Sequence, residues 1–418
     1  MTGHHIGSRR ACPVCRAQHA TLIRTMRFVL PEGHPLASEY GVVYCEGCGF
    51  VYADTPASPR AYDDYYSGLS KYADPSVSTG GGVTPWDLSR LQETAALVAS
   101  LLNNKQASIL DIGCANGGLL ASLWSLGYTN LCGIDPSLRC VEFVRARLGI
   151  EAHAGTLSSV PGELGQFDCI VASHVLEHVL DLRGALQRLS QLTKEDGAVY
   201  AEVPDAERYV DFLVAPFQEF NVEHVNHFSL ESLIGLFRAC GWEPRASGRR
   251  LITVARGLHY PVVFAFLKKQ RVDRPGSPIV SGASLRAAMK SYVGRSQSLL
   301  DSLDATLRRR FGPGDPVIVW GTGALASRLL AETCLGKADM KAFVDSNPVS
   351  WGKALAGAPI IPPHEAKNWE HPILVASILH SDEILRTIRA DLRLPNEVVL
   401  INADGLRSYE EGELHASG

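Results

Sequence analysis

Apolar positions along the chain alternate between short continuous runs and longer stretches with helical spacing. The short runs predict buried strands at residues 108–110, 131–135, 168–172 and 197–203. The longer stretches place apolar residues three and four apart, which predicts helices at 119–126, 137–148, 181–192 and 230–240. Strands that alternate with helices are typical of an α/β fold, so residues 86–257 are predicted to form a doubly wound parallel sheet.

The same alternation returns near the C-terminus, after a long polar helix predicted at 285–310. Residues 316–326 contain a strand, the turn Gly321-Thr322-Gly323 and a helix, and further strands are predicted at 342–345 and 373–377. This pattern predicts a second Rossmann-like domain at 311–418, joined by linker helices at 258–310. Its glycine turn suits a diphosphate. The domain could hold a second nucleotide or be purely structural.

Length and composition narrow the class of protein. A chain of 418 residues predicts two or three domains, and 46% apolar with 20% charged residues is typical of a globular protein. The net charge of −4 gives no indication of a nucleic-acid partner. The apolar run at 260–267 is too short to span a membrane. No secretory signal opens the chain, and several cysteines stand alone in apolar segments, so we expect a cytoplasmic protein.

Two C-x2-C pairs in the N-terminal 60 residues predict a zinc-binding module. Cys12 and Cys15 form the first pair, and Cys45 and Cys48 form the second. Four thiolates make a closed tetrahedral site, which is typical of structural zinc. Two unrelated buried pairs, or a redox C-x-x-C, are the alternatives. The intervening segment predicts a strand, a loop and a strand, as in a zinc ribbon.

A tyrosine-rich segment, residues 61–85, connects this module to the central domain. It contains Tyr62, Tyr65, Tyr66 and Tyr72 close to two acids. The segment is either a lid over the cofactor domain, whose hydroxyls bind a sugar or move a proton, or a solvated connector.

A glycine-rich turn follows the first strand of the central domain. It reads Asp111-Ile112-Gly113-Cys114-Ala115-Asn116-Gly117, and a second acid, Asp135, ends the next strand. Glycines let the backbone approach a ligand closely, and an acid in the position of Asp135 can accept hydrogen bonds from ribose hydroxyls. Asp111 would repel a phosphate and attract a cationic cofactor. The spacing also differs from the G-x-G-x-x-G fingerprint of dinucleotide sites.

The D-x-G-x-x-x-G turn resembles motif I of class I S-adenosylmethionine (SAM) methyltransferases. The segment from Asp168 to His178 is similar to the one that follows the fourth strand in that family. The resemblance implies SAM as cofactor. The expected SAM-binding residues are Asp111, Gly113, Asn116, Gly117, Asp135, Pro136, Thr156, Leu157, Ser173, His174 and His178.

A cluster of acid and histidine precedes the helix predicted after residue 229. Glu223, His224 and His227 lie within five residues of one another. A metal site or a purely structural role would each explain them. A histidine beside a glutamate also suits proton transfer, because the pKa of histidine lies near working pH.

A four-cysteine module, a SAM domain, a Glu-His pair and a C-terminal Rossmann-like domain together resemble deoxysugar C-methyltransferases. That resemblance implies carbon methylation of a nucleotide-linked keto-sugar through an enolate, in natural-product biosynthesis. It also implies that the C-terminal domain helps to enclose the nucleotide-sugar. It implies His224 as base and Glu223 as the group that orients it, with Tyr72 and His227 as further catalytic candidates. Asn221 stands where the family carries a tyrosine. The alternatives are an O- or N-methyltransferase and a SAM-binding protein without turnover.

Overall fold

The computed structural model describes residues 5–70, 82–159, 164–255, 257–270, 282–402 and 405–409. Contacts divide the chain into two compact units. The first contains Met1–Arg24, Gly41–Phe212 and Glu223–Lys290, and the second contains Thr25–Tyr40, Leu213–Val222 and Ser291–Gly418. The predicted module and central domain therefore share one unit. Within the described ranges, no helix combines the length and apolarity needed to cross a membrane.

The first unit is built on a seven-stranded sheet of order β11-β12-β9-β8-β5-β6-β7. Its parallel part consists of β5 (Ile109–Ile112), β6 (Leu131–Asp135), β7 (Glu151–Ala154), β8 (Phe167–Ser173) and β9 (Thr193–Pro204). The predicted α/β class and the strands at 108–110, 131–135, 168–172 and 197–203 are confirmed. The sheet is not parallel throughout, because β12 pairs antiparallel with both β9 and β11.

The antiparallel edge corrects the prediction of linker helices beginning at residue 258. Residues Leu258–Lys269 form β12, and Trp242–Ala255 form β11. The run Tyr260-Pro261-Val262-Val263-Phe264 carries β-branched and aromatic residues, which pack well on a pleated surface. A short apolar run cannot be assigned to strand or helix by period alone, and here its pairing partner β9 decides the outcome.

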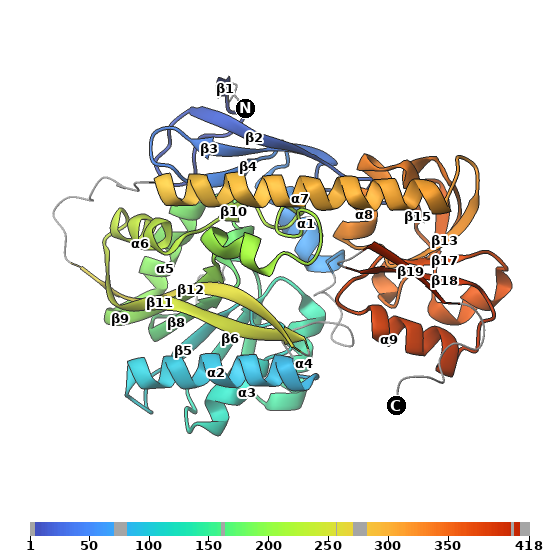
Figure 1. Cartoon of the computed structure of the whole chain (residues 1–418). Helices are drawn as coiled ribbons and strands as arrows, with labels where there is room; N and C mark the ends of the chain where they lie inside the picture. The colour runs from blue at the N-terminus through green and yellow to red at the C-terminus, as the bar shows by residue number, and fades with distance from the viewer. Residues whose placement is uncertain are drawn as a thin grey trace. The chain divides into compact units, whose positions relative to one another are not determined.

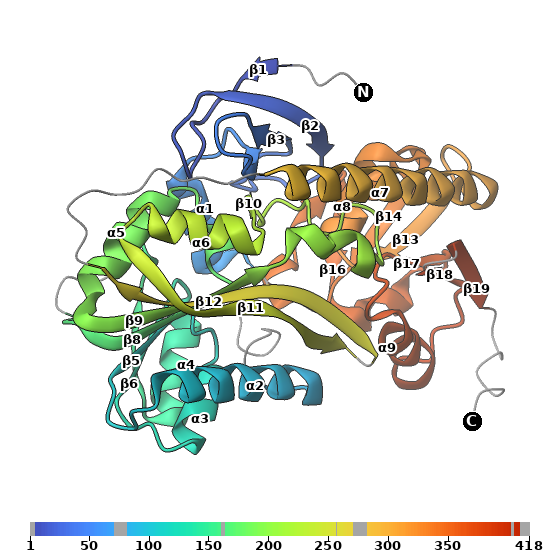
Figure 2. The same ribbon diagram turned by 60° about the vertical axis from the view of Figure 1, so that its left-hand side comes forward.

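Helices cover both faces of this sheet. Figure 1 and Figure 2 show α2 (Pro85–Leu102), α3 (Gly118–Ser125) and α4 (Leu138–Leu148) on one face, and α5 (Leu182–Leu192) and α6 (Leu230–Arg238) on the other. Ser229 caps the start of α6: its hydroxyl accepts a hydrogen bond from the Ser232 amide, and the Ser232 hydroxyl accepts one from the Ser229 amide. This reciprocal capping fixes where α6 begins, immediately after the histidine segment.

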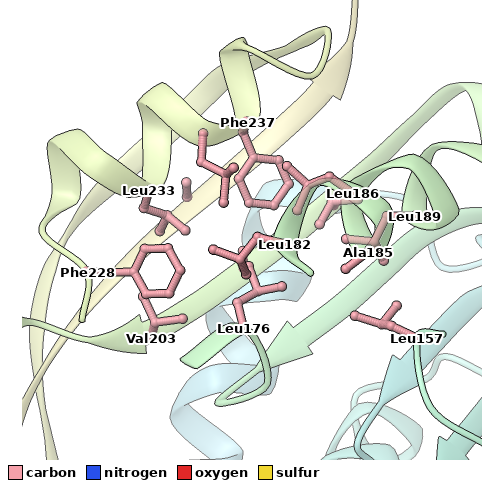
Figure 3. Close-up of a cluster of buried hydrophobic side chains, with 14 of the residues drawn as sticks. Leu157, Leu176, Leu182, Ala185, Leu186, Leu189, Val203, Phe228, Leu233 and Phe237 are labelled. Atoms are coloured by element: carbon pink, nitrogen blue, oxygen red, sulfur yellow. The ribbon is translucent and has the colours of Figure 1, made fainter. Parts of the chain in front are cut away.

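The apolar cluster between α5 and α6 anchors the short turn η2 (Leu176–His178). Figure 3 shows Leu233 and Phe237 of α6 facing Leu182 and Leu186 of α5, with Leu176 among them. Burial of each such side chain contributes about 1.5–3 kcal/mol. Because Leu176 is fully buried in this cluster, the next two residues of η2, Glu177 and His178, have a fixed position at the edge of the sheet.

The N-terminal cysteines belong to a five-stranded sheet of order β1-β2-β3-β4-β10. Its strands are β1 (His5–Gly7), β2 (His19–Arg27), β3 (Glu39–Cys45), β4 (Val51–Asp54) and β10 (Asn226–His227). The predicted strand–loop–strand arrangement between the cysteine pairs is confirmed by β2 and β3. β10 comes from the histidine segment far along the chain and pairs antiparallel with β4. Its partner strand was not foreseen, because local sequence does not specify it.

The second unit holds another seven-stranded sheet, of order β15-β16-β14-β13-β17-β18-β19. Its strands are β13 (Pro316–Trp320), β14 (Asp339–Val344), β15 (Ala354–Leu355), β16 (Ala358–Ile361), β17 (Ile373–Val375), β18 (Val398–Asn402) and β19 (Gly405–Tyr409). The helices α8 (Ala324–Glu332) and α9 (Ser381–Arg386) accompany it, and α7 (Ala283–Arg310) precedes it. The long helix and the Rossmann-like alternation are as predicted.

Candidate cofactor and acceptor site

The glycine turn after β5 requires backbone conformations that residues other than glycine rarely adopt. Gly113 has φ of 72° and Gly117 has φ of 75°. A Cβ on Gly117 would lie 2.7 Å from Leu148 Cδ1 on α4, and one on Gly113 would lie 3.1 Å from Val175 Cγ2, just before η2. The turn is therefore packed closely against both α4 and the segment that enters η2. Asn116 is buried in the same turn, directly before the N-cap of α3.

Asp135 ends β6 beside this turn, as the sequence predicts. Its Oδ2 accepts a hydrogen bond from the Ala115 amide at 2.9 Å, and its Oδ1 accepts one from the Ser137 amide at 2.8 Å. Burial raises its pKa to about 6, although these two amides act in the opposite direction. A carboxylate fixed in this way keeps lone pairs available for ligand hydroxyls.

Asp111 is the more unusual acid. It is 3% exposed at the end of β5, and burial together with the neighbouring Asp135 raises its pKa to about 8. An ionised carboxylate in such a place is costly unless a cation accompanies it. The residues fit SAM: its sulfonium and ammonium groups would supply the positive charge at Asp111, and its ribose would face Asp135.

Asp111→Asn is expected to weaken SAM binding by about tenfold or more, because a hydrogen bond to a charged group contributes about 1.5–3 kcal/mol. In the wild type, affinity should rise between pH 6 and pH 8, since the cation favours ionised Asp111 and a pKa near 8 makes that ionisation incomplete below pH 8. The variant should lose this rise. Isothermal titration calorimetry across that pH range measures both effects.

Asp168→Asn is a matched control on the same sheet. Asp168 lies near the start of β8, where it pairs with Lys194 at 2.8 Å, at the opposite end of the strand from Ser173. The Asp168→Asn variant should bind SAM with the affinity and pH dependence of the wild type. Equal weakening in both variants would contradict the assignment of Asp111.

Ser173 and His174 leave the end of β8 at the same edge. His174 has φ of 56°, a left-handed conformation uncommon for its residue type, and its amide donates to the Glu202 carbonyl at 2.8 Å. Glu202 on β9 is fully buried, and it accepts hydrogen bonds from Tyr200, Ser173 and Arg250. These bonds hold the pKa of Glu202 below its ordinary value in spite of burial. Sequence reasoning missed Glu202 and Arg250, because strand pairing brings them together.

The remaining predicted cofactor residues surround β6 and β7. Pro136 follows Asp135 directly and precedes the cap of α4. Thr156 lies two residues beyond β7, and its hydroxyl contacts that of Ser158 at 2.7 Å. Leu157 is buried in the apolar cluster seen in Figure 3, so its side chain contributes to the core.

The Glu223–His224 segment is attached to η2 by several hydrogen bonds. The Val225 amide donates to the Glu177 carbonyl at 2.8 Å, and the Asn226 side-chain amide donates to the carbonyls of Leu176 and Val179. His178 Nδ1 lies 3.1 Å from the Glu223 carbonyl oxygen. These contacts place the predicted acid–histidine pair beside η2, and Val175, just before η2, faces Gly113 of the glycine turn.

Two tyrosines of α1 (Pro59–Gly68) complete the cluster. Tyr65 donates to Glu223 Oε1 at 2.7 Å, and Tyr66 Oη lies 2.8 Å from His178 Nδ1. Tyr62, Tyr65 and Tyr66 are spaced three and four apart, and Ser58 caps the helix just before Pro59. This spacing was the available signal that the tyrosines share one helix face. Tyr72, the tyrosine singled out by resemblance, lies outside the described residues.

A ring of histidines surrounds Glu177. The ring centroids of His178 and His224 are 5.0 Å apart, and ligand-type atoms of Glu177, His178 and His224 all lie within 4.8 Å of one another. His174 Nδ1 lies 3.1 Å from Glu177 Oε1. His227 differs from these: it is fully buried in β10, its Nδ1 is 3.4 Å from Tyr209 Oη, and burial lowers its pKa to about 3.

The four N-terminal cysteines converge at one point. Cys12 Sγ and Cys48 Sγ are 3.7 Å apart, Cys15 Sγ and Cys45 Sγ are 3.4 Å apart, and all four sulfurs lie within 4.8 Å of one another. A tetrahedron with Zn–S bonds of about 2.3 Å has sulfurs about 3.8 Å apart. The cluster therefore has the donors and the spacing of a four-thiolate zinc site.

Comparison with known proteins gives the class of the first unit. Residues 88–247 match the family model of a methyltransferase domain. Together with the strand order and the glycine turn, this match defines a class I SAM-dependent methyltransferase domain, and the prediction of a SAM-dependent methyltransferase is confirmed at the level of this domain. Residues 315–399 in the second unit match a separate family model, described as C2185-like, N-terminal.

Individual relatives share only parts of the chain. The ubiquinone biosynthesis O-methyltransferase of Methylocella silvestris is 36% identical over 22% of this chain and 38% of its own length. The C-methyltransferase NovU of Streptomyces niveus is 24% identical over 62% of this chain and 63% of its own length. The structure of the 1,6-didemethyltoxoflavin-N1-methyltransferase of Burkholderia thailandensis, with bound S-adenosylhomocysteine, is 20% identical, with a TM-score of 0.38, over 53% of this chain and 95% of that one. The chain thus spans less than two thirds of either curated relative.

Proposed function

We propose that the protein methylates carbon next to a ketone in a nucleotide-linked deoxysugar. One observation carries the proposal: a histidine–glutamate cluster with two tyrosines lies at the cofactor edge of the sheet, where it can bind a polar acceptor and remove a proton. The similarity to NovU, which extends well beyond the methyltransferase domain, supports carbon as the acceptor atom.

His224 acts as the general base in this proposal. It takes a proton from the carbon beside the ketone, and the electron pair of that C–H bond forms an enolate. A positioned histidine contributes about 100- to 10,000-fold to such a step. SAM, when bound, supplies the methyl group that the enolate carbon takes up. Tyr65 and Tyr66 offer hydroxyls for the sugar or for the enolate oxygen.

Glu223 has a second role in this proposal, in addition to the predicted orientation of His224. It accepts a hydrogen bond from Tyr65 at 2.7 Å, and we propose that it orients this hydroxyl toward the acceptor as well as supporting the adjacent His224. The buried carboxylate within reach of the His224 ring is that of Glu177.

The outer parts of the chain have supporting roles in this proposal. Cys12, Cys15, Cys45 and Cys48 would hold one structural zinc ion. The Gly321–Gly323 turn of the C-terminal Rossmann-like domain precedes α8, and by itself it would suit a diphosphate.

Deuterium exchange tests carbon methylation directly. Incubation of the enzyme with a dTDP-linked keto-deoxysugar in D₂O, without SAM, should replace hydrogen next to the ketone, as detected by proton NMR and mass spectrometry. Addition of SAM should then give a product with a new C–CH₃ group. Transfer of the methyl group to a hydroxyl, with no exchange at carbon, would overturn the proposal.

Oxygen methylation is the second candidate. It is favoured by the 36% identity to a ubiquinone biosynthesis O-methyltransferase, which is confined to 98 residues. The same histidine cluster could deprotonate a hydroxyl. The position of the transferred methyl group in the product, on carbon or on oxygen, distinguishes the two candidates.

A further inference from the structure

Glu177 is a deeply buried acidic group near the proposed base. Its side chain is 1% exposed, in η2, and its Oε1 lies 3.1 Å from His174 Nδ1 and 4.0 Å from His178 Nε2. Its second oxygen, Oε2, is buried and has no hydrogen-bond partner among the described residues. Burial alone would raise its pKa, but the bond with His174 and the nearby His178 and His224 hold the pKa below its ordinary value.

The groups that can balance the negative charge of Glu177 are the neighbouring histidines. Three imidazoles face it: His174 before η2, His178 in η2, and His224 on the attached segment. Farther out, Tyr66 on α1 contacts His178, and Tyr260 on β12 lies beside the His174 ring. The other buried carboxylate near His174 belongs to Glu202, and its charge is matched by the guanidinium of Arg250.

We propose that Glu177 is a positioning residue of the reaction: its carboxylate is the shared counter-ion of His174, His178 and His224, and it stabilises the proton that His224 takes from the acceptor. This inference rests on the proposed function of His224 as base. The proton moves from the acceptor carbon to the His224 ring, and Glu177 stays ionised throughout. An imidazolium in a buried site needs such an anion, since burial otherwise favours the neutral ring.

The arrangement also explains why η2 and the Glu223–His224 segment are joined by backbone hydrogen bonds. The bond from the Val225 amide to the Glu177 carbonyl fixes the distance between the two segments. His178 Nδ1 contacts the Glu223 carbonyl and Tyr66, so its Nε2 is directed to the Glu177 side. Burial lowers the pKa of His178, and the charges of Glu177 and Glu223 oppose that effect.

The test compares Glu177→Gln, which keeps the shape and removes the charge, with Glu177→Asp, which keeps the charge. An opposite charge within about 4–6 Å shifts a pKa by about 1–3 units. In Glu177→Gln, the acid limb of the deuterium-exchange rate should therefore move down by about one pH unit or more, and the plateau rate should fall because the base is weaker. Glu177→Asp should restore the wild-type limb.

Two further variants test the direction and the size of the shift of the acid limb. His174→Gln, measured in the same exchange assay without SAM, removes the hydrogen bond to Glu177 and leaves its charge to the other two rings, so the limb should move up. This variant also serves if Glu177→Gln fails to fold. Glu223→Gln should shift the limb less than Glu177→Gln, because the carboxylate of Glu223 is bonded to Tyr65. A larger shift in Glu223→Gln, or none in Glu177→Gln, overturns the proposal.

Histidine NMR separates this proposal from the proposed function. Spectra of protein labelled with ¹⁵N-histidine, without any acceptor, follow the ring nitrogens of the cluster, with signals assigned by the histidine variants. At least one cluster histidine should lose about one pKa unit or more in Glu177→Gln, whether or not the enzyme methylates a sugar. Unchanged histidine titrations would overturn the role of Glu177. So would a metal ion, additional to zinc, that is bound in the wild type and lost in Glu177→Gln.

Discussion

Replacement of His224 by glutamine is expected to lower the rate of deuterium exchange into the keto-sugar by about 100- to 10,000-fold. Glutamine keeps the polarity and approximate size of the side chain but cannot accept a proton at neutral pH. The binding of SAM should remain within a few-fold, because the expected cofactor residues lie on β5, β6 and β8 or in the segments that directly follow β5, β6, β7 and β8. Deuterium exchange, methyl transfer and calorimetric SAM binding should be measured on the same preparation. Together they distinguish a loss of proton transfer from a loss of folded protein.

His153→Gln is the matched control for this prediction. His153 lies on β7 in the same sheet, partly exposed, with its Nε2 2.8 Å from Glu151. It should retain activity close to that of the wild type. If His224→Gln exchanged deuterium at the wild-type rate, another group of the cluster would be the base, and the assignment of His224 would be lost.

The cofactor half of the site could be predicted from sequence because its signals are local. Asp111, Gly113 and Gly117 lie within seven residues, and the positive φ values of the two glycines are what such a turn needs. Asp135 ends the neighbouring strand, so its place follows from the alternation of strands and helices. The C-x2-C spacing likewise predicts convergence of the cysteines without knowledge of the rest of the fold.

The acceptor half could be predicted only in part, because its partners are distant in sequence. Glu223 and His224 were recognised as a pair, but the bond from Tyr65 to Glu223 joins residues 158 positions apart. This hydrogen bond depends on the pairing of β10 with β4, which no local sequence pattern specifies. Glu177 could not be singled out, since nothing in the run Val175-Leu176-Glu177-His178 indicates that its side chain points into a group of histidines.

The boundaries of the domains were the least predictable feature. Leu213–Val222 directly precedes the Glu223–His224 pair in sequence, yet it belongs to the second unit. There the fully buried Arg328 of α8 donates to the carbonyls of Pro216 and Phe220, and Tyr292 Oη accepts a hydrogen bond from the Glu219 amide at 2.9 Å. A buried arginine satisfied by carbonyls is a long-range feature, which a search for composition changes or linkers cannot detect.

Loss of the proposed zinc site should affect folding more strongly than any other change proposed. Cys45→Ser is expected to abolish zinc binding, for which structural sites have apparent free energies of about 10–16 kcal/mol at pH 7. Cys45 ends β3, and Cys12, Val14, Cys45 and Phe50 pack in the same apolar cluster as residues of the methyltransferase domain. Zinc content by plasma mass spectrometry should fall from one ion per chain to less than one, with a clearly lower midpoint of thermal unfolding.

The loss should extend to catalysis through the strand pairing between β4 and β10. The Ala53 amide on β4 donates to the Val225 carbonyl at 2.9 Å, one residue after His224, so disorder around the cysteines removes a support of the proposed base. Hydrogen exchange should therefore increase at β10 as well as at β3 and β4, and methyl transfer should fall while the glycine turn still binds SAM. Cys240→Ser changes a half-buried cysteine that is not one of the four converging sulfurs, and it should leave zinc, exchange and activity unchanged. Full activity in a zinc-free Cys45→Ser protein would show that the cysteine module and the histidine segment are independent.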